Sequence, residues 1–259
     1  MPLATINDHA IYYEDTGGDG TAVVFSHGFL MDRSMFDPQI AALSERFRCV
    51  SWDERGFGQT ECKGPFTYWD SASDLLGLLD QLSIERAVLV GMSQGGFVSL
   101  RAALTSPERV SGVVLIDSQA GIDPPEVNDG YQQLHDTWVA HGAIEDVAGV
   151  IAGLIFGPSI DHHEWLVRWR SRPPTALTHP FNALVGRDDI THRLGEIECP
   201  VLIFHGSEDQ AIPMEQAESV RDGVRNCVGL VVVDGASHSA NLTHPDAVNG
   251  PLADFIAGI

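Results

Sequence analysis

Three residue types that cooperate in nucleophilic catalysis occur in this chain, each soon after a run of apolar residues. Ser93 lies in GMSQGG after AVLV, Asp209 in GSEDQ after CPVLIF, and His238 in GASH after GLVVVD. A serine hydroxyl is a weak nucleophile at neutral pH, so it needs a base within hydrogen-bond reach. Histidine suits this role, and a carboxylate can fix its tautomer and stabilise the imidazolium that forms. These residue types point to acyl transfer by an activated serine.

The glycines around Ser93 favour a catalytic interpretation over a structural one. Gly91 and Gly95 allow a sharp turn between a strand and a helix, in which larger side chains would collide with neighbouring backbone. A serine at this position could instead only cap the helix. The apolar run before it and the helix expected after it favour an exposed nucleophile, because an isolated Gly-x-Ser-x-Gly pattern also occurs by chance.

Two backbone N–H groups are candidates for stabilising an oxyanion. A helix that starts after Ser93 directs its free N–H groups at the serine, so Gln94 can donate its backbone N–H. The second donor is expected in the loop after the first buried run, where His27-Gly28-Phe29 places the N–H of Phe29.

Six apolar runs with helical segments between most of them indicate the fold class. The runs lack polar alternation, which is typical of strands buried on both faces of a parallel sheet. The opening ATIN and AIYYEDTGG segments alternate more and predict an antiparallel hairpin at the sheet edge. We expect an α/β protein with a mostly parallel, twisted sheet of about eight strands flanked by helices. The runs are TAVVFS, FRCVSW, AVLVGMS, GVVLIDS, CPVLIFHG and GLVVVDG.

This sheet would bring the candidate catalytic residues together. Ligands of open parallel sheets bind beyond the carboxyl ends of the strands. Ser93, Asp209 and His238 all follow predicted strand ends, in that order along the chain. Asp117, in GVVLIDS, also ends a predicted strand and is a second candidate for the carboxylate.

The alternation of strands and helices stops once. Residues 121–198 contain amphipathic segments separated by Gly and Pro, and this stretch is too long for a loop in a compact domain. We expect a small helical cap inserted into a core made of residues 1–120 and 199–259. Large aromatic residues of the cap are mostly core residues by type, but some would line an apolar pocket. The candidates for that pocket are Phe156, Trp165, Trp169 and Phe181.

Several motifs along essentially the whole chain resemble the α/β-hydrolase fold superfamily. They are GMSQGG, HGF, DERGFGQT, GSEDQ, and GASH followed by Pro245. Within that superfamily the chain is similar to small members with a helical cap, which include carboxylesterases, enol-lactonases, carbon–carbon bond hydrolases and cofactor-free haloperoxidase-like esterases.

The resemblance implies a role for each site residue. It favours Asp209 over Asp117, since most relatives draw the carboxylate from the loop that precedes the histidine loop. The serine at the turn argues against epoxide hydrolases and haloalkane dehalogenases, which carry a carboxylate nucleophile there. The implied nucleophile, acid and base are Ser93, Asp209 and His238, and the implied oxyanion donors are the N–H groups of Phe29 and Gln94.

The expected function is a serine hydrolase that cleaves a small to medium carboxylic ester or lactone through an acyl-enzyme, with no cofactor and no metal ion. Carbon–carbon bond hydrolysis and perhydrolysis on the same triad are alternatives. A ligand-binding receptor that retains the fold is a further alternative, against which the intact triad argues.

The charge of the chain argues against some classes of binding partner. The chain has 259 residues with 36 acidic and 15 basic side chains, a net charge of −21. Such a surface repels nucleic acid phosphates and anionic lipids, so we expect a small-molecule substrate and neither nucleic acid nor membrane as a partner. The first residues lack the basic and apolar regions of an export signal, so a cytoplasmic location is expected. The four cysteines form no CxxC pair, and nothing in the sequence indicates an oligomeric state.

Overall fold

An eight-stranded, mostly parallel sheet forms the centre of the computed structural model, which describes residues 2–158 and 161–259. The strand order is β1-β2-β4-β3-β5-β6-β7-β8. The first two strands form an antiparallel hairpin that pairs with β4, and all later pairs are parallel. The α/β fold class expected from the sequence is confirmed. The strands are β1 (Leu3–Ile6), β2 (His9–Asp15), β3 (Ala22–Ser26), β4 (Arg48–Trp52), β5 (Ala87–Met92), β6 (Val110–Ile116), β7 (Val201–Gly206) and β8 (Cys227–Val233).

Five of the six continuous apolar runs became inner strands of the sheet, and the sixth, GLVVVDG, became the edge strand β8. Every residue of β3, β5 and β7 is buried, as expected for strands covered on both faces. The last strand, β8, lies at the sheet edge and leaves Val228 and Val232 exposed. The inner strands consist mostly of unbroken apolar segments because neither of their faces meets water.

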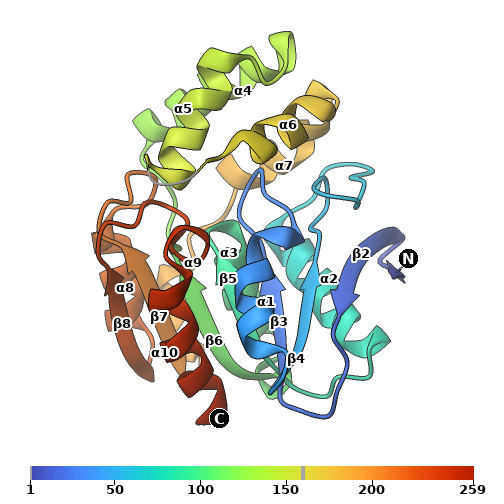
Figure 1. The fold of residues 1–259 in the computed structure, drawn as a ribbon, viewed down its shortest axis with the longest axis vertical. Helices are drawn as coiled ribbons and strands as arrows, with labels where there is room; N and C mark the ends of the chain where they lie inside the picture. The colour runs from blue at the N-terminus through green and yellow to red at the C-terminus, as the bar shows by residue number, and fades with distance from the viewer. Residues whose placement is uncertain (1, 159–160) are drawn as a thin grey trace.

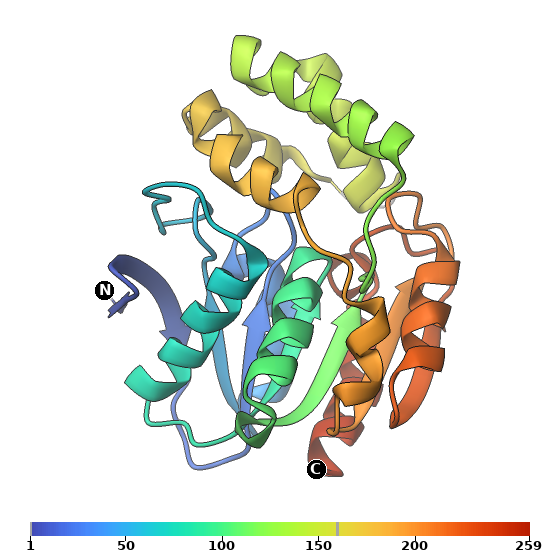
Figure 2. The same cartoon turned by 180° about the vertical axis from the view of Figure 1, so that it is seen from behind.

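Helices cover both faces of the sheet and divide the core into two apolar clusters. Helices α1 and α10 lie in front of the sheet in Figure 1, whereas α2, α3 and α8 lie in front of it in the reverse view of Figure 2. Side chains alternate between the clusters along each strand, so Val24 belongs to one and Phe25 to the other. The helices are α1 (Asp37–Leu43), α2 (Tyr68–Gln81), α3 (Gln94–Thr105), α8 (Met214–Gly223), α9 (Ala240–Thr243) and α10 (Pro245–Ala257).

A group of helices from the insertion covers the carboxyl ends of the strands (Figures 1 and 2). Its members are α4 (Pro125–His141), α5 (Glu145–Phe156), α6 (His163–Ser171) and α7 (Thr178–Val185). After α7, Ile190, Leu194 and Ile197 belong to the core cluster beside α8. The cap helices therefore end at α7, and the chain has returned to the core before residue 198.

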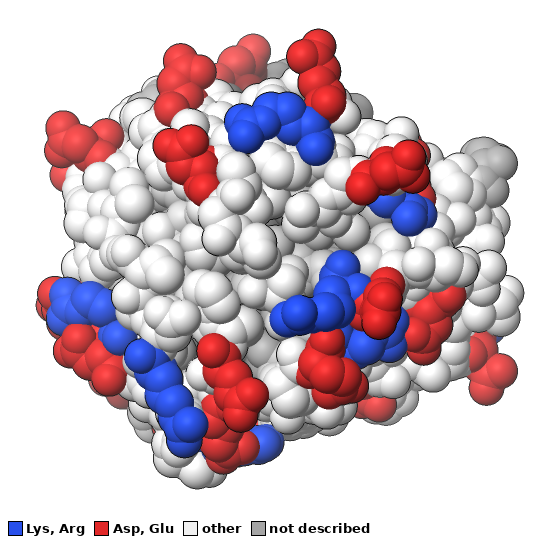
Figure 3. Space-filling model, turned by 90° about the horizontal axis from the view of Figure 1, so that it is seen from below, with Lys and Arg blue, Asp and Glu red and all other residues white. Residues whose placement is uncertain are grey.

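Charged side chains of both signs are interspersed on the face that lies away from the cap (Figure 3). On the core domain, Arg48 pairs with Asp15 and Arg109 pairs with Asp80, at 2.7 Å in each case. None of the helices in the described residues combines the length and apolarity needed to cross a bilayer.

Candidate active site

Ser93 occupies a strained turn between β5 and α3. Its φ of 50° and ψ of −115° lie in a region that residues other than glycine rarely adopt. A Cβ atom on Gly91 would meet the backbone of Gly95, and one on Gly95 would meet the carbonyl group of Ser26. The Ser93 N–H donates to the carbonyl of Ile116 at 2.9 Å, which ties the turn to β6. The glycines therefore permit the close packing that holds the serine in this conformation.

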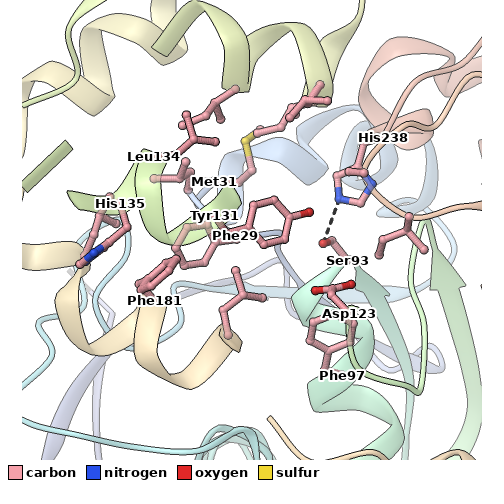
Figure 4. Close-up of a pocket in the computed structure, with 18 of the residues that line it drawn as sticks. Phe29, Met31, Ser93, Phe97, Asp123, Tyr131, Leu134, His135, Phe181 and His238 are labelled. Carbon is pink, nitrogen blue, oxygen red and sulfur yellow. Dashed lines mark hydrogen bonds between the residues drawn. The ribbon is translucent and has the colours of Figure 1, made fainter. Parts of the chain in front are cut away.

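The structure brings Ser93, His238 and Asp209 into one hydrogen-bonded chain. Nε2 of His238 lies 3.0 Å from Oγ of Ser93, the contact marked in Figure 4. Nδ1 of His238 lies 2.8 Å from Oδ2 of Asp209. The other carboxylate oxygen, Oδ1, accepts the N–H groups of Ala211 and Ile212 at 2.8 and 3.0 Å. These bonds fix the carboxylate, which in turn orients the imidazole with Nε2 toward the serine.

The carboxylate changes the basicity of the histidine. Burial alone would lower the pKa of His238, but the charge of Asp209 and its hydrogen bond raise that pKa above its usual value. Burial opposes ionisation of Asp209 as well, yet the charge and hydrogen bond of His238 outweigh it and lower the pKa of Asp209. His238 is therefore a stronger base than a free imidazole. Its partner, Asp209, stays ionised at neutral pH.

Asp117, the second candidate for the carboxylate, serves the backbone instead. Its two oxygens accept the N–H groups of Gly206 and Ala240 at 2.7 and 2.8 Å. Burial and the nearby charge of Asp209 raise the pKa of Asp117 to about 6. Asp117 thus joins the end of β7 to the start of α9, which positions the loops that carry Asp209 and His238.

Asp117, His205 and Asp209 also place one oxygen or nitrogen atom each within 4.8 Å of one another, a spacing that a metal ion could use. Both oxygens of each carboxylate already accept backbone N–H groups or the His238 ring. His205 Nε2 lies 2.9 Å from the carbonyl of Ile212, to which it donates. We interpret the cluster as a hydrogen-bond network that supports the triad.

Of the expected oxyanion donors, Phe29 lies on the loop after β3, and Gln94 is the first residue of α3, directly after Ser93. Within the described residues, neither backbone N–H donates to a protein acceptor. The loop that carries Phe29 is held by His27, whose Nδ1 donates to the carbonyl of Gly28 at 2.8 Å and whose Nε2 accepts the Glu54 N–H at 3.0 Å. Burial lowers the pKa of His27 to about 4, so the ring is neutral and can hold both bonds. Two unpaired donors therefore remain beside the serine.

A cavity opens from Ser93 and His238 toward the cap (Figure 4). The volume of the cavity that is open to the centre of a water molecule is about 130 Å³. Most of the lining is apolar and comes from α4, α5 and α7 together with the loops of the core. Its larger members include Phe29, Phe97, Leu134, Trp138, Ile155 and Phe181.

Of the four aromatic residues expected in the pocket, the structure places one there. Phe181 lines the cavity, but Phe156, Trp165 and Trp169 are not among the described residues that line it. Phe156 stacks on both tryptophans, with ring centres 6.3 Å apart in each case, and Trp169 Nε1 donates to the carbonyl of Leu30 at 2.7 Å. The three therefore form the interior of the cap and attach it to the loop that carries Phe29 and Leu30.

Sequence reasoning missed the residues of α4 that face the cavity. Tyr131, Leu134 and Trp138 are spaced three and four residues apart, which places them on one side of a helix. That spacing was the available signal. Sequence reasoning also missed a group of polar residues at one corner of the cavity, here called the polar corner. It consists of Gln119, Asp123, Tyr131 and Arg187.

Comparison with known proteins agrees with this fold. The sequence model of the alpha/beta hydrolase fold matches residues 21–245. The 3-oxoadipate enol-lactonase 1 of Acinetobacter baylyi is 28% identical, covering 92% of this chain and 89% of its own length. The non-heme haloperoxidase of Rhodococcus erythropolis is 29% identical and covers 99% of each chain.

A solved structure of a thermophilic esterase from Thermogutta terrifontis superimposes with a TM-score of 0.87 at 28% identity, covering 96% of this chain and 94% of that one. The family model spans most of the chain, from β3 to the start of α10. The matched residues include all of the parallel strands and the turn at Ser93. The protein is therefore a member of the alpha/beta hydrolase fold family.

Proposed function

We propose that the protein is a serine hydrolase that cleaves a small to medium carboxylic ester or lactone through an acyl-enzyme. The observation that carries the proposal is the chain of hydrogen bonds from Asp209 through His238 to Ser93, whose serine end lines a mostly apolar cavity. A nucleophile, its base and the group that orients the base all meet where a substrate can enter.

The geometry supports a two-step reaction. Nε2 of His238 takes the proton of Ser93 as Oγ attacks the substrate carbonyl, while Nδ1–H stays bonded to Asp209. The negative oxygen that forms is placed near the N–H groups of Phe29 and Gln94. His238 then returns the proton to the departing alcohol, which leaves an acyl group on Ser93.

Water completes the cycle by the same route in reverse. His238 removes a proton from the water that attacks the acyl group, and Ser93 recovers that proton as the carboxylic acid departs. A lactone differs only in that the alcohol and the acid remain parts of one product. No step requires a group that the chain does not supply.

The cavity supports a substrate of limited size. Phe181, Trp138 and Leu134 line the cavity from the cap helices α7 and α4. A lining of this kind favours a compact acyl or alcohol group over a long chain. The esterase and enol-lactonase relatives point to the same two bond types.

The test is the initial rate of hydrolysis of p-nitrophenyl esters from acetate to decanoate. We expect activity on the shorter chains that vanishes in Ser93→Ala. Ser99→Ala is the matched control, because Ser99 lies on α3, the helix that follows Ser93, and donates its hydroxyl to the carbonyl of Gly95. Equal rates in the wild type and Ser93→Ala would contradict the proposal, as would fastest turnover on long-chain emulsions.

Perhydrolysis is the second candidate, supported by the haloperoxidase relative that covers the whole chain. Hydrogen peroxide would replace water in the attack on the acyl-enzyme, and a peracid would replace the acid as product. Formation of peracetic acid from acetate and peroxide, lost in Ser93→Ala, would establish this reaction.

A further inference from the structure

The polar corner of the cavity holds its only two formally charged side chains. Among the described residues that line the cavity, histidines apart, Asp123 and Arg187 alone carry a charge. The side chain of Arg187 is buried, with 2% of it exposed, and that of Asp123 is 10% exposed. Any substrate that fills the cavity must therefore adapt to this pair.

Each of the three guanidinium nitrogens of Arg187 donates a hydrogen bond to the protein. Its Nη2 donates to Oδ2 of Asp123 at 2.9 Å, its Nη1 to the carbonyl of Leu184 at 2.8 Å, and its Nε to the carbonyl of Gly121 at 3.2 Å. Its guanidinium also lies over the ring of Phe97, 4.8 Å from the ring centre. A guanidinium used in this way, with its charge matched by a carboxylate, has little left to offer an anionic ligand.

Asp123 is held in place from its other side as well. Its Oδ1 accepts the side-chain amide of Gln119 at 2.8 Å, so both carboxylate oxygens have donors. The carboxylate lies on the same side of the cavity as Ser93 (Figure 4). A second carboxylate brought into this space would face that charge in an environment of low polarity, and it would lose its own hydration.

Tyr131 completes the corner with a neutral donor. Its hydroxyl points toward Ser93 and His238 (Figure 4), and it has no hydrogen-bond partner among the described residues. Burial and the charge of Asp123 raise the pKa of Tyr131 to about 12, so the phenol keeps its proton at neutral pH. It can donate to an uncharged acceptor oxygen, such as a carbonyl, an ether or a hydroxyl oxygen.

We propose that Asp123 neutralises Arg187 and thereby makes the cavity select uncharged esters or lactones that carry an acceptor oxygen for Tyr131, over substrates that carry a carboxylate. This inference rests on the proposed function and specifies its substrate class. Without Asp123, the same arginine would present an unmatched positive charge inside an apolar cavity, which favours an anion. One residue would therefore set the charge preference.

The test measures binding without turnover. In the Ser93→Ala protein, calorimetry compares phenylacetamide with phenylacetate, two molecules of similar shape that differ in charge. We expect the amide to bind at least about tenfold more tightly than the anion. Equal or tighter binding of the anion overturns the proposal, whether or not the variant examined next folds.

Asp123→Asn, added to Ser93→Ala, tests the residue itself. The amide side chain keeps the size of Asp123 but removes its charge, so the dissociation constant of phenylacetate is expected to fall by about tenfold while that of phenylacetamide changes little. The control is Asp188→Asn, since Asp188 pairs with Arg101 at 2.7 Å and is not among the residues that line the cavity. An unchanged ratio of the two constants in folded Asp123→Asn protein would overturn the role of Asp123.

The two proposals can fail separately. Loss of the proposed function would appear as absence of Ser93-dependent ester hydrolysis, whereas loss of this inference would appear as the wrong charge preference in a protein that performs no turnover. A turnover assay adds a third readout: Asp123→Asn should raise kcat/KM for mono-p-nitrophenyl glutarate relative to p-nitrophenyl butyrate, mainly through KM.

Discussion

His238 is hydrogen-bonded to Asp209, at 2.8 Å, and not to Asp117, although both carboxylates belong to one buried cluster. The two acids differ in what occupies their oxygens. Asp209 accepts two backbone N–H groups with one oxygen and leaves the other for the imidazole, whereas both oxygens of Asp117 accept backbone N–H groups of other loops. The chemistry and the support of the site are therefore assigned to different carboxylates.

Exchanging each acid for its amide separates these roles. Asp209→Asn should fold normally and lower kcat by about 10⁴-fold, because the amide no longer holds Nδ1–H in the tautomer that leaves Nε2 free. Asp117→Asn should retain most of kcat but lower the free energy of unfolding by about 1–3 kcal/mol, because its amide N–H₂ would face a backbone donor. Burst kinetics and urea unfolding measure the two effects. If Asp117→Asn abolished acylation and Asp209→Asn did not, the assignment would be wrong.

The pH dependence of kcat/KM should follow the base. His238 must be neutral to accept the serine proton, so the rate rises with pH as the ring loses its proton. The charge of Asp209 raises the pKa of His238, and Asp117 and Asp123 add to this, so the midpoint of the rise should lie above 6.5. Removing one of these charges in Asp123→Asn should move the midpoint to lower pH. A midpoint at or below 6.5 in the wild type would contradict the electrostatics described here.

The same shift has a consequence for stability with the opposite sign. A group whose pKa is raised on folding stabilises the folded state below its unfolded pKa, and this contribution is lost as the pH rises through the folded pKa. The protonated form of His238 therefore stabilises the fold in mild acid, in the range where the enzyme should lose activity. The contribution of His238 to stability therefore does not decrease over the pH range in which its protonation lowers the rate.

The catalytic strand ends were predictable because local patterns determine them. The unbroken apolar runs before Ser93 and Asp209 identify strands buried on both faces, and parallel strands end at one edge of a sheet. The glycines at 91 and 95 also predicted the tight turn at Ser93, because a side chain at either position would collide with neighbouring backbone. Expectations that rested on chain direction and on close backbone approach agreed with the structure.

The cavity lining was harder to predict because a helix of the cap has apolar neighbours on several sides. Trp169 and Phe181 look alike in the sequence, yet one closes the interior of the cap and the other faces the substrate space. The polar corner has no local signature at all, since Asp123 and Arg187 are 64 residues apart and meet only in the folded chain. Periodicity groups the residues of a cap helix by face, but which face lines the cavity depends on how the helices pack.

Two alanine substitutions check this division of the cap. Phe181→Ala should enlarge the cavity and move the preferred p-nitrophenyl ester to longer acyl chains. Phe156→Ala should lower the free energy of unfolding by about 3–5 kcal/mol, because it empties a stacked aromatic cluster, and should leave the chain-length profile unchanged. A shifted profile in Phe156→Ala would show that this residue shapes the substrate space after all.

Substitution of Gly95 tests whether the strained turn holds Ser93 in its position. A Cβ on Gly95 would press against the carbonyl of Ser26, which lies in the fully buried strand β3 and cannot move aside cheaply. Gly95→Ala should therefore distort the turn and reduce kcat by at least about 10²-fold, a loss typical of misplaced catalytic groups. Gly153→Ala is the matched control: Gly153 is exposed on α5, and its added methyl group would meet nothing within 4 Å. That change should raise the free energy of unfolding by about 0.5–1 kcal/mol through helix propensity and leave kcat as it is. Full activity in Gly95→Ala would mean that the turn tolerates a side chain, and that the glycines do not hold the nucleophile in place.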